Sequence, residues 1–469
     1  MALLSDEEWE KKNFRNWLAV QLRKAYLDAR KNGKRRTRDE QDFEINEDEN
    51  LRRLLNDILR RTYKPSRGTV HIIYKPVMRE IFAAPFRDRV VHHLIYNLVY
   101  DFWDRQFIYD SYSCRIGKGT LMGIRRLDYH IRSASGNYAR EVEIVKLDIQ
   151  GFFMSIPRKK LLDFALDGLR KQFKGRLDSP VYKMLEFLWT QIIMDDPVEG
   201  VKVIGRKSDW KKLPPSKSLF NQPPGVGIVI GNLTSQLLSN IFLNQLDRFV
   251  KYRLDYEHYG RYVDDFYIIV KMQDLPQLKR DIKAIEGFLT GMGVRLHPKK
   301  RAFYTASQGV PFLGAVVHKG YILPGERLKK NFRKACFEVE VGKKDVATLV
   351  SYLGHVKHFN KVRFVESAFE KVAWEYNYWF LILDSFNGWV ADRTWFAKGN
   401  GLGANEATDA KTVVLIVVVG RVEVRRVQVQ IVRVVVAVRW PTPVVAVRAT
   451  IVRGRAVEVA GVEEQEDKL

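Results

Sequence analysis

Hydrophobic residues near the start of the chain recur with the period of an α-helix. Five aliphatic side chains lie at positions i, i+3, i+4, i+7 and i+8 of one stretch: Leu51, Leu54, Leu55, Ile58 and Leu59. This spacing gathers them on one face of a helix, where they can pack against other elements. We therefore expect residues 1–62 to form a basic, helical N-terminal region.

Strand and helix patterns alternate over the next two hundred and sixty residues. The run from Thr69 to Tyr74 is typical of a short strand, and the stretch from Asp88 to about Phe107 is typical of a helix. Apolar residues stand at both odd and even positions from Val142 to Ile149, on both faces of a strand, and predict a buried strand.

Two further helices are expected downstream. Pro157 to Leu169 has a proline near its first turn. An apolar helical pattern from Leu237 to Leu246 has Thr234 or Ser235 as its candidate N-cap.

Another apolar run, from Tyr259 to Val270, encloses the adjacent aspartates Asp264 and Asp265. We expect a tight hairpin with both aspartates at its tip. Residues 326–390 return to a helical pattern with many aromatic residues.

The pattern changes again over residues 412–462, which contain 21 valines, eight arginines and no lysine. Apolar and polar residues alternate there with the period of a half-exposed strand. Three interpretations remain open for this segment: an appended β element, a disordered or aggregation-prone tail, or a peculiarity of the reading frame.

Charge indicates the kind of partner. The chain has 469 residues with 79 Lys plus Arg and 55 Asp plus Glu, a net charge of +24. Such an excess favours a polyanionic partner, most often nucleic acid. The segment 31–38 holds five basic residues in eight, and we expect Lys34, Arg35 and Arg36 to contact phosphates.

Two cysteines, Cys114 and Cys336, exclude a disulfide scaffold and a four-cysteine zinc module. The N-terminus has no apolar secretory core, and the longest aliphatic run, Val413 to Val419, is too short to span a membrane. We expect a cytoplasmic protein.

Three aspartates suggest metal chemistry. Asp148 lies in VKLDIQGFF, and Asp264 and Asp265 lie in YVDDF. Aspartate pairs are common in turns, but burying adjacent like charges is costly unless a cation neutralises them. Two-metal phosphoryl transfer uses carboxylates that converge on a pair of cations, and Mg²⁺ prefers oxygen ligands.

Seven blocks, in order, resemble those of reverse transcriptases. They lie at residues 75–93, 111–120, 147–153, 225–240, 262–265, 296–300 and 312–314. The resemblance implies an α+β right-hand polymerase with fingers (63–141), a ferredoxin-like palm with fingers insertions (142–325) and a helical thumb (326–390). The Val/Arg-rich tail (391–469) has no counterpart in the family.

The resemblance also implies roles for individual residues. Asp148, Asp264 and Asp265 would hold two Mg²⁺ ions, with Mn²⁺ as an alternative metal. Lys75 and Arg79 would clamp the triphosphate of the incoming nucleotide, because ammonium and guanidinium groups suit phosphate.

Other matched positions would act around the nascent base pair. Phe153 would be the steric gate against a 2′-hydroxyl group, and Lys300 would protonate or stabilise the leaving pyrophosphate, with Lys299 as a rival. Arg115 and Lys118 would contact the template or support the fingers.

The block IGNLTSQ (230–236) indicates a subclass. Ile230 and Gln236 stand where group II intron enzymes usually have Gln and Pro, and this form resembles the reverse transcriptases of diversity-generating retroelements. Those enzymes copy a template-repeat RNA with errors concentrated at adenines. Ile230, Gly231 and Gln236 are the expected nucleotide contacts, and Ile230 can only pack where Gln could hydrogen-bond.

The subclass implies several partners: template RNA, cDNA or primer, dNTPs and a small, basic, ring-forming accessory variability protein. Enzymes of this kind are bacterial, archaeal or phage-encoded. The alternatives are a defence-associated reverse transcriptase of the abortive-infection type and a catalytically silent RNA-binding scaffold.

Overall fold

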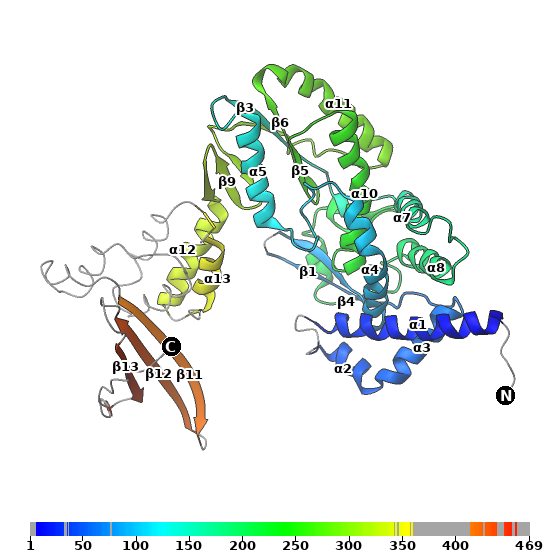
Figure 1. Ribbon diagram of the computed structural model, residues 1–469, viewed down its shortest axis with the longest axis horizontal. Helices are drawn as coiled ribbons and strands as arrows, with labels where there is room; N and C mark the ends of the chain where they lie inside the picture. The colour runs from blue at the N-terminus through cyan, green and yellow to red at the C-terminus, as the bar shows by residue number, and fades with distance from the viewer. Residues whose placement is uncertain are drawn as a thin grey trace, which may run out of the picture. The chain divides into compact units, whose positions relative to one another are not determined.

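The computed structural model describes residues 6–31, 35, 37–75, 77–341, 343–344, 347–356, 358–359 and four strands between 413 and 456. The chain divides into two compact units, Met1–Gly320 and Tyr321–Leu469 (Figure 1). In the described part of the chain, no helix is both long and apolar enough to cross a membrane.

Three helices begin the first unit, as the sequence predicts: α1 (Asp6–Ala29), α2 (Arg38–Ile45) and α3 (Glu47–Leu59). The predicted stripe lies on α3. Leu54, Leu55 and Ile58 are buried, and Leu51 and Leu59 pack against the same core at partial burial. The stripe therefore attaches α3 to the body of the unit by apolar contact.

A small sheet follows. β1 (Thr69–Ile73) pairs antiparallel with β2 (Arg79–Ala83) and parallel with β4 (Lys202–Val203). The helix α4 (Phe86–Gln106) comes directly after β2. The strand and helix predicted here are confirmed, with the helix starting two residues before Asp88.

The larger sheet has four antiparallel strands in the order β5-β6-β3-β7. Their bounds are β3 (Val142–Asp148), β5 (Tyr259–Tyr262), β6 (Asp265–Lys271) and β7 (Ala302–Thr305). The helix α10 (Leu233–Arg248) lies between β3 and β5 in the sequence, and α11 (Leu275–Met292) lies between β6 and β7. This βαββαβ order, with the first and third strands central, is ferredoxin-like, so the expected α+β palm is confirmed.

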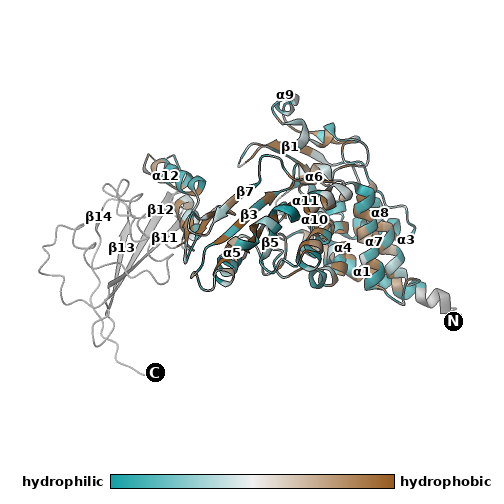
Figure 2. Ribbon diagram, turned by 90° about the horizontal axis from the view of Figure 1, so that it is seen from above, coloured by the Kyte–Doolittle hydropathy of each residue, from teal (hydrophilic) through white to brown (hydrophobic). Residues whose placement is uncertain are grey.

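Successive side chains of each strand point to opposite faces of the sheet, and helices cover both faces. Leu147 and Phe266 point into the main core with residues of α10 and α11. On the other face Tyr267 contacts His130 of α5 (Thr120–Ala134), 3.0 Å from ring nitrogen to hydroxyl. The helices around the sheet carry apolar and polar stretches side by side (Figure 2).

The remaining elements of this unit are short or peripheral. They are α6 (Phe152–Ser155), α7 (Arg158–Gln172), α8 (Pro180–Met194), α9 (Lys207–Trp210), η2 (Pro215–Lys217), η3 (Leu219–Asn221), η4 (Phe249–Arg253), η5 (Met272–Asp274), β8 (Val310–Phe312) and β9 (Ala315–His318). Pro157 is the N-cap of α7. The N-cap of α10 is Asn232, so the expected Thr234 or Ser235 was wrong: both are buried inside the first turn.

The second unit begins with β10 (Tyr321–Pro324), α12 (Glu326–Glu340) and α13 (Ala347–Val356). Phe332 and Cys336 of α12 are buried in one cluster with Leu349 and Leu353 of α13. The predicted helices are thus present up to 356, and the rest of the expected thumb, 360–390, lies outside the described residues.

Four strands are described in the Val/Arg-rich tail: β11 (Val413–Val424), β12 (Val427–Val438), β13 (Val445–Val452) and β14 (Arg455–Ala456). Each pairs antiparallel with the next. Among the three interpretations of this tail, the described backbone is that of the β element.

Candidate active site

The three aspartates meet at the ends of the two central palm strands. Asp148 is the last residue of β3 and lies directly opposite Asp265, the first residue of β6. The backbone carbonyl of Asp264 accepts a hydrogen bond from the Ile149 N–H, at 3.2 Å. A register of this kind brings the three carboxyl groups to one end of the sheet.

The hairpin turn differs by one residue from the prediction. Tyr262 pairs with Asp265, so the two-residue loop is Val263-Asp264 and not Asp264-Asp265. Val263 has a φ of 55°, in the left-handed region. Two-residue hairpin loops use positive φ because it matches the twist of the flanking strands.

The block at 296–300 also contacts the site, through Asp148. The backbone N–H of His297 donates to the Asp148 carbonyl, at 2.7 Å. Lys300 Nζ then lies 2.8 Å from Asp148 Oδ2. The side chain of its rival Lys299 makes no such contact with the aspartates in the described structure.

A second lysine contacts the cluster, and sequence reasoning missed it. Lys146 Nζ lies 3.2 Å from Asp265 Oδ2 and 5.5 Å from the ring centroid of Phe312. Lys146 precedes Asp148 by two residues, and strand periodicity puts such residues on one face. That spacing was the available signal.

Burial controls the electrostatics of the cluster. It raises the pKa of Asp264 to about 6, with the Asp148 charge as the next cause. Burial also raises the pKa of Asp265, while Lys146 acts in the opposite direction. Cations near these groups would favour their ionised forms.

An all-oxygen donor set at this site suits a hard divalent cation such as Mg²⁺. Asp148, Asp264 and Asp265 are the residues that could hold it. Within the described residues, no three His, Cys, Asp or Glu side chains are already arranged as a complete metal site.

Phe153 lies beside this end of the sheet. Its neighbour Phe152 is buried in the main core, where its ring centroid lies 6.2 Å from that of Phe242. Phe153 is only partly buried and contacts a second cluster that includes Phe82 of β2. Phe152 is therefore a core residue, whereas Phe153, which also packs against the main core, keeps part of its side chain accessible.

The segment with Ile230 and Gly231 lies against β2. The Ile230 carbonyl accepts a hydrogen bond from the Phe82 N–H, at 3.0 Å. A Cβ at Gly231 would lie 2.4 Å from the Phe82 carbonyl oxygen. The missing Cβ thus makes room for the Phe82 backbone, and the predicted nucleotide contact of Gly231 stays a prediction. Gln236 is exposed on α10.

Lys75 and Arg79 are exposed, before and at the start of β2. Neither side chain has a hydrogen bond or ion pair with the described residues. Their charges are thus available to a ligand, and their predicted role stays a prediction.

Half of the chain matches a known protein family. The model of the family "Reverse transcriptase (RNA-dependent DNA polymerase)" matches residues 75–317. The chain belongs to this reverse transcriptase family. No curated protein matches the chain.

Solved structures similar to this reverse transcriptase include telomerases. Apo telomerase from Candida tropicalis has 11% sequence identity and a TM-score of 0.41, with 72% of this chain and 61% of that chain covered. Telomerase from Candida albicans in complex with a fragment of telomeric RNA has 11% identity and a TM-score of 0.40, with 74% and 62% covered. The chain therefore spans about three fifths of the telomerase chains it matches.

Arg115 of this reverse transcriptase points inward. Its side chain is 5% exposed. Nε lies 2.7 Å from Asp104 Oδ1, and Nη1 donates to the carbonyls of Ile108 and Ser111. These contacts bind the guanidinium group to Asp104 and to the segment that follows α4, and the two expected roles of Arg115 stay predictions.

The other expected nucleic-acid contacts are less enclosed. Lys118 hydrogen-bonds the Tyr109 carbonyl, and burial lowers its pKa to about 8. Arg35 lies 3.2 Å from Glu44. Lys34 and Arg36 lie outside the described residues.

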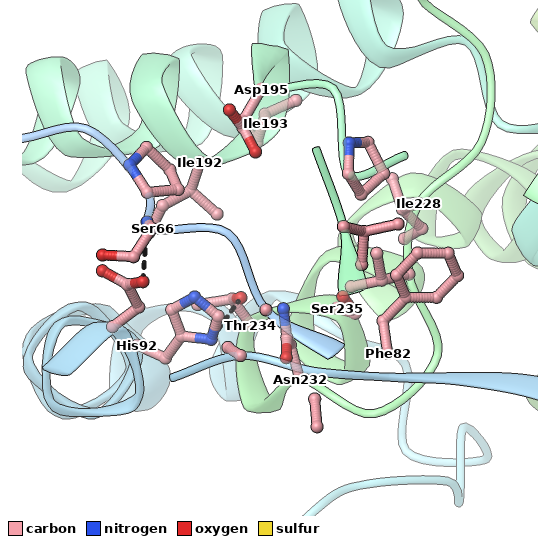
Figure 3. A pocket seen from close by; sticks show the side chains of 18 of the residues that line it. Ser66, Phe82, His92, Ile192, Ile193, Asp195, Ile228, Asn232, Thr234 and Ser235 are labelled. Atoms are coloured by element: carbon pink, nitrogen blue, oxygen red, sulfur yellow. Dashed lines mark hydrogen bonds between the residues drawn. The ribbon is translucent and has the colours of Figure 1, made fainter. Parts of the chain in front are cut away.

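An open cleft is lined in part by Phe82 and Ala83, at the end of β2. Figure 3 shows Ser66, His92, Asp195 and Thr234 around it. The His92 ring is buried, which lowers its pKa to about 3, and its Nδ1 lies 3.4 Å from the Thr234 hydroxyl. The cleft is formed by segments of the fingers, α8 and α10, whereas the aspartates lie on β3 and its neighbouring hairpin.

Proposed function

We propose that this reverse transcriptase copies an RNA template into DNA by metal-assisted nucleotidyl transfer. The observation that carries the proposal is the register that puts Asp148 opposite Asp265, with Asp264 one residue away in the turn. Carboxylates delivered by rigid strands are the arrangement that nucleotidyl transfer with two cations requires.

Asp148, Asp264 and Asp265 would hold two Mg²⁺ ions, with Mn²⁺ as a substitute. Bound there, the ions would lower the pKa of the primer 3′-hydroxyl and stabilise the charge on the leaving pyrophosphate. Because two lysines already contact Asp148 and Asp265, binding would change the partners of these side chains.

The protein groups around the aspartates supply orientation and charge. Lys75 and Arg79 would bind the triphosphate of the incoming dNTP, and Lys300 would stabilise the pyrophosphate. Phe153 would contact the sugar where a ribonucleotide carries its 2′-hydroxyl. The net charge of +24 favours binding of template RNA and cDNA through their phosphates.

The finer proposal is an error-prone enzyme of a diversity-generating retroelement, acting in the cytoplasm with a ring-forming accessory protein. It rests on Ile230 and Gln236, because the apolar Ile230 side chain cannot test a base pair by hydrogen bonding. Mutagenesis at template adenines would then follow from a reduced free-energy gap between correct and incorrect pairs.

Primer extension on one defined RNA template tests the activity. We expect Mg²⁺-dependent cDNA synthesis by the parent and none by Asp264→Asn or Asp148→Asn, while both variants bind RNA. Asp178→Asn is the matched control, since that side chain is fully exposed. Full activity of Asp264→Asn would refute the site, and RNA binding without synthesis by the parent would favour the silent scaffold.

The same cDNA, when sequenced, tests the subclass. Errors concentrated at template adenines would support the assignment to the diversity-generating subclass. An even, low error rate would favour the defence-associated alternative.

A further inference from the structure

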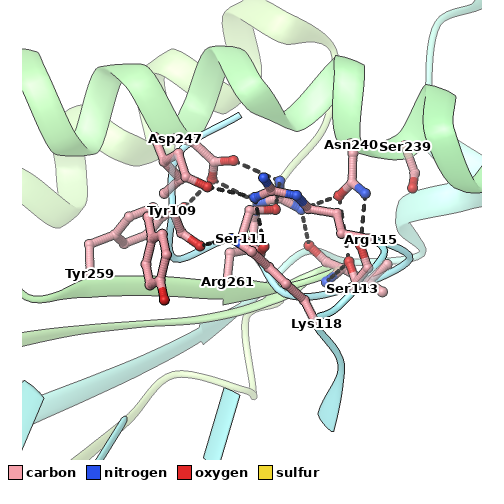
Figure 4. Close-up of polar contacts among 12 residues, drawn as sticks. Tyr109, Ser111, Ser113, Arg115, Lys118, Ser239, Asn240, Asp247, Tyr259 and Arg261 are labelled. Atoms are coloured by element: carbon pink, nitrogen blue, oxygen red, sulfur yellow. Dashed lines mark hydrogen bonds and ion pairs between the residues drawn. The ribbon is translucent and has the colours of Figure 1, made fainter. Parts of the chain in front are cut away.

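A buried arginine lies directly behind the catalytic turn. Both Arg261, in β5, and Asp247, in α10, have side chains with 0% exposure. They form a two-pronged ion pair in which Nε lies 2.7 Å from Oδ1 and Nη2 lies 2.7 Å from Oδ2 (Figure 4).

The remaining donors of the guanidinium group are also used. Nη2 donates to Ser111 Oγ at 3.1 Å, and Nη1 donates to Asn240 Oδ1 at 3.3 Å and to the Val263 carbonyl at 3.0 Å. Together with the two bonds to Asp247, all five N–H donors have acceptors. One of these bonds reaches the turn itself.

A second hydrogen bond holds the other side of the same residue. The Val263 N–H donates to Ser113 Oγ at 3.0 Å. Ser113 Oγ also lies 3.5 Å from Asn240 Oδ1, and the Asn240 amide donates to the Ser113 carbonyl at 2.9 Å. Both peptide groups of Val263 are therefore fixed by one connected, buried network.

Val263 needs such support. Its φ of 55° is unfavourable for a β-branched residue, and conformations of this kind persist only where the surroundings impose them. The next residue is Asp264, so the Val263 backbone sets where the Asp264 carboxyl group points.

We infer that Arg261 and Ser113 are positioning residues that hold Val263 in its left-handed conformation and thereby fix Asp264 beside Asp148. The inference rests on the proposed function of the aspartates. A purely structural role would consist of the Arg261–Asp247 pair stabilising the fold, with no particular effect on the turn.

Substitution of two buried serines in one segment can distinguish the positioning role from the purely structural role. Ser111 and Ser113 are 0% and 1% exposed, and both belong to the Arg261 network. Ser113 bonds to Val263, whereas the Ser111 hydroxyl accepts from Arg261 and, among the described residues, has no bond to Val263. Ser111→Ala is therefore the matched control for Ser113→Ala.

The experiment uses the full chain and three measurements: primer-extension kinetics, binding of Mn²⁺ alone by electron paramagnetic resonance, and Tm. We expect Ser113→Ala to lower kcat about tenfold and to weaken Mn²⁺ binding about fivefold, with the dNTP KM unchanged. Ser111→Ala should keep kcat and Mn²⁺ binding within about twofold, at a similar change in Tm. Ser111→Ala removes one buried hydrogen bond, and Ser113→Ala removes the bond to Val263 together with a long one of 3.5 Å to Asn240, so Tm is measured for both variants.

Equal effects of the two substitutions on kcat and Mn²⁺ binding would overturn the inference, as would unchanged Mn²⁺ binding by Ser113→Ala. Arg261→Lys is the second test: Lys cannot reproduce the five-donor fork, so a folded variant should lose Mn²⁺ affinity. If the parent binds Mn²⁺ but makes no cDNA, the proposed function fails while the Mn²⁺ comparison still decides the positioning role. A parent that binds no Mn²⁺ overturns both.

Discussion

Lys300 and Asp148 lie 152 positions apart in the sequence, and their side chains form a 2.8 Å ion pair at the end of β3. The loop that carries Lys300 is held in place by the bond from the His297 N–H to the Asp148 carbonyl. The ammonium group thus contacts the residue that ends β3, one of the two central strands.

Lys300→Ala should lower kcat for primer extension about tenfold, because it removes the cation beside Asp148. Lys299→Ala should change kcat less than twofold, since its side chain does not reach the aspartates. Steady-state kinetics with a saturating dNTP distinguishes the two. A larger effect at Lys299 would transfer the pyrophosphate role to that residue.

Phe153→Ala should raise ribonucleotide incorporation, because it removes the ring expected to exclude a 2′-hydroxyl. The neighbouring Phe152 provides a control, because its substitution should affect stability and leave sugar selectivity nearly unchanged. Phe152→Ala should cost about 3–5 kcal/mol of folding free energy, as buried Phe-to-Ala changes do, with little effect on the choice of sugar. Competition between dNTP and rNTP gives the first measurement and denaturant unfolding the second; unchanged selectivity in Phe153→Ala would make it another core residue.

Ile230→Gln should reduce misincorporation, most visibly opposite template adenine. An amide at this position adds a hydrogen-bonding test of the pair worth about 1 kcal/mol, or several-fold in errors. Sequencing cDNA from parent and variant on one template measures the change. Retained activity with the parent's error spectrum would count against Ile230 as a fidelity determinant.

His92 should make the protein less stable in acid. Burial lowers its folded pKa to about 3, whereas an unfolded histidine titrates near 6.5. Between these values only the unfolded state binds the proton, so the free energy of unfolding should fall as pH falls from about 6.5, by up to ~1.4 kcal/mol per pH unit. His92→Gln should reduce this slope in urea titrations from pH 6.5 to 4.5, and His355→Gln, at an exposed position, should not.

The periodicity of the sequence was enough to predict the strands and helices that deliver the aspartates. The strand ending at Asp148 and the hairpin carrying Asp264 have strong apolar patterns, and local patterns of this kind survive in the fold. The observed turn lies one residue earlier than the predicted one. The reason is that the positive φ of Val263 depends on its contacts with Arg261 and Ser113. No local signal reports those contacts.

Buried charge explains the other differences. Arg115 and Arg261 are charged residues, yet both are buried: Arg115 bonds to carbonyl and carboxylate groups 4 to 11 residues away, and Arg261 bonds to Asp247 and to Ser111, 150 residues away. Pairing of this kind is visible only once the chain has folded. Gly231 likewise depends on the Phe82 carbonyl, about 150 residues earlier in the sequence.

The direct opposition of Asp148 and Asp265 also determines where the molecule tolerates changes in length. A single-residue insertion inside β3 or β6 would shift their pairing by one and turn every following side chain to the other face of the sheet. The connection between α8 and α10, by contrast, contains only short elements and leaves that pairing untouched. A fused domain or an affinity tag should therefore be accepted in the connection around residues 205–212. The same insertion in either central strand would separate the aspartates.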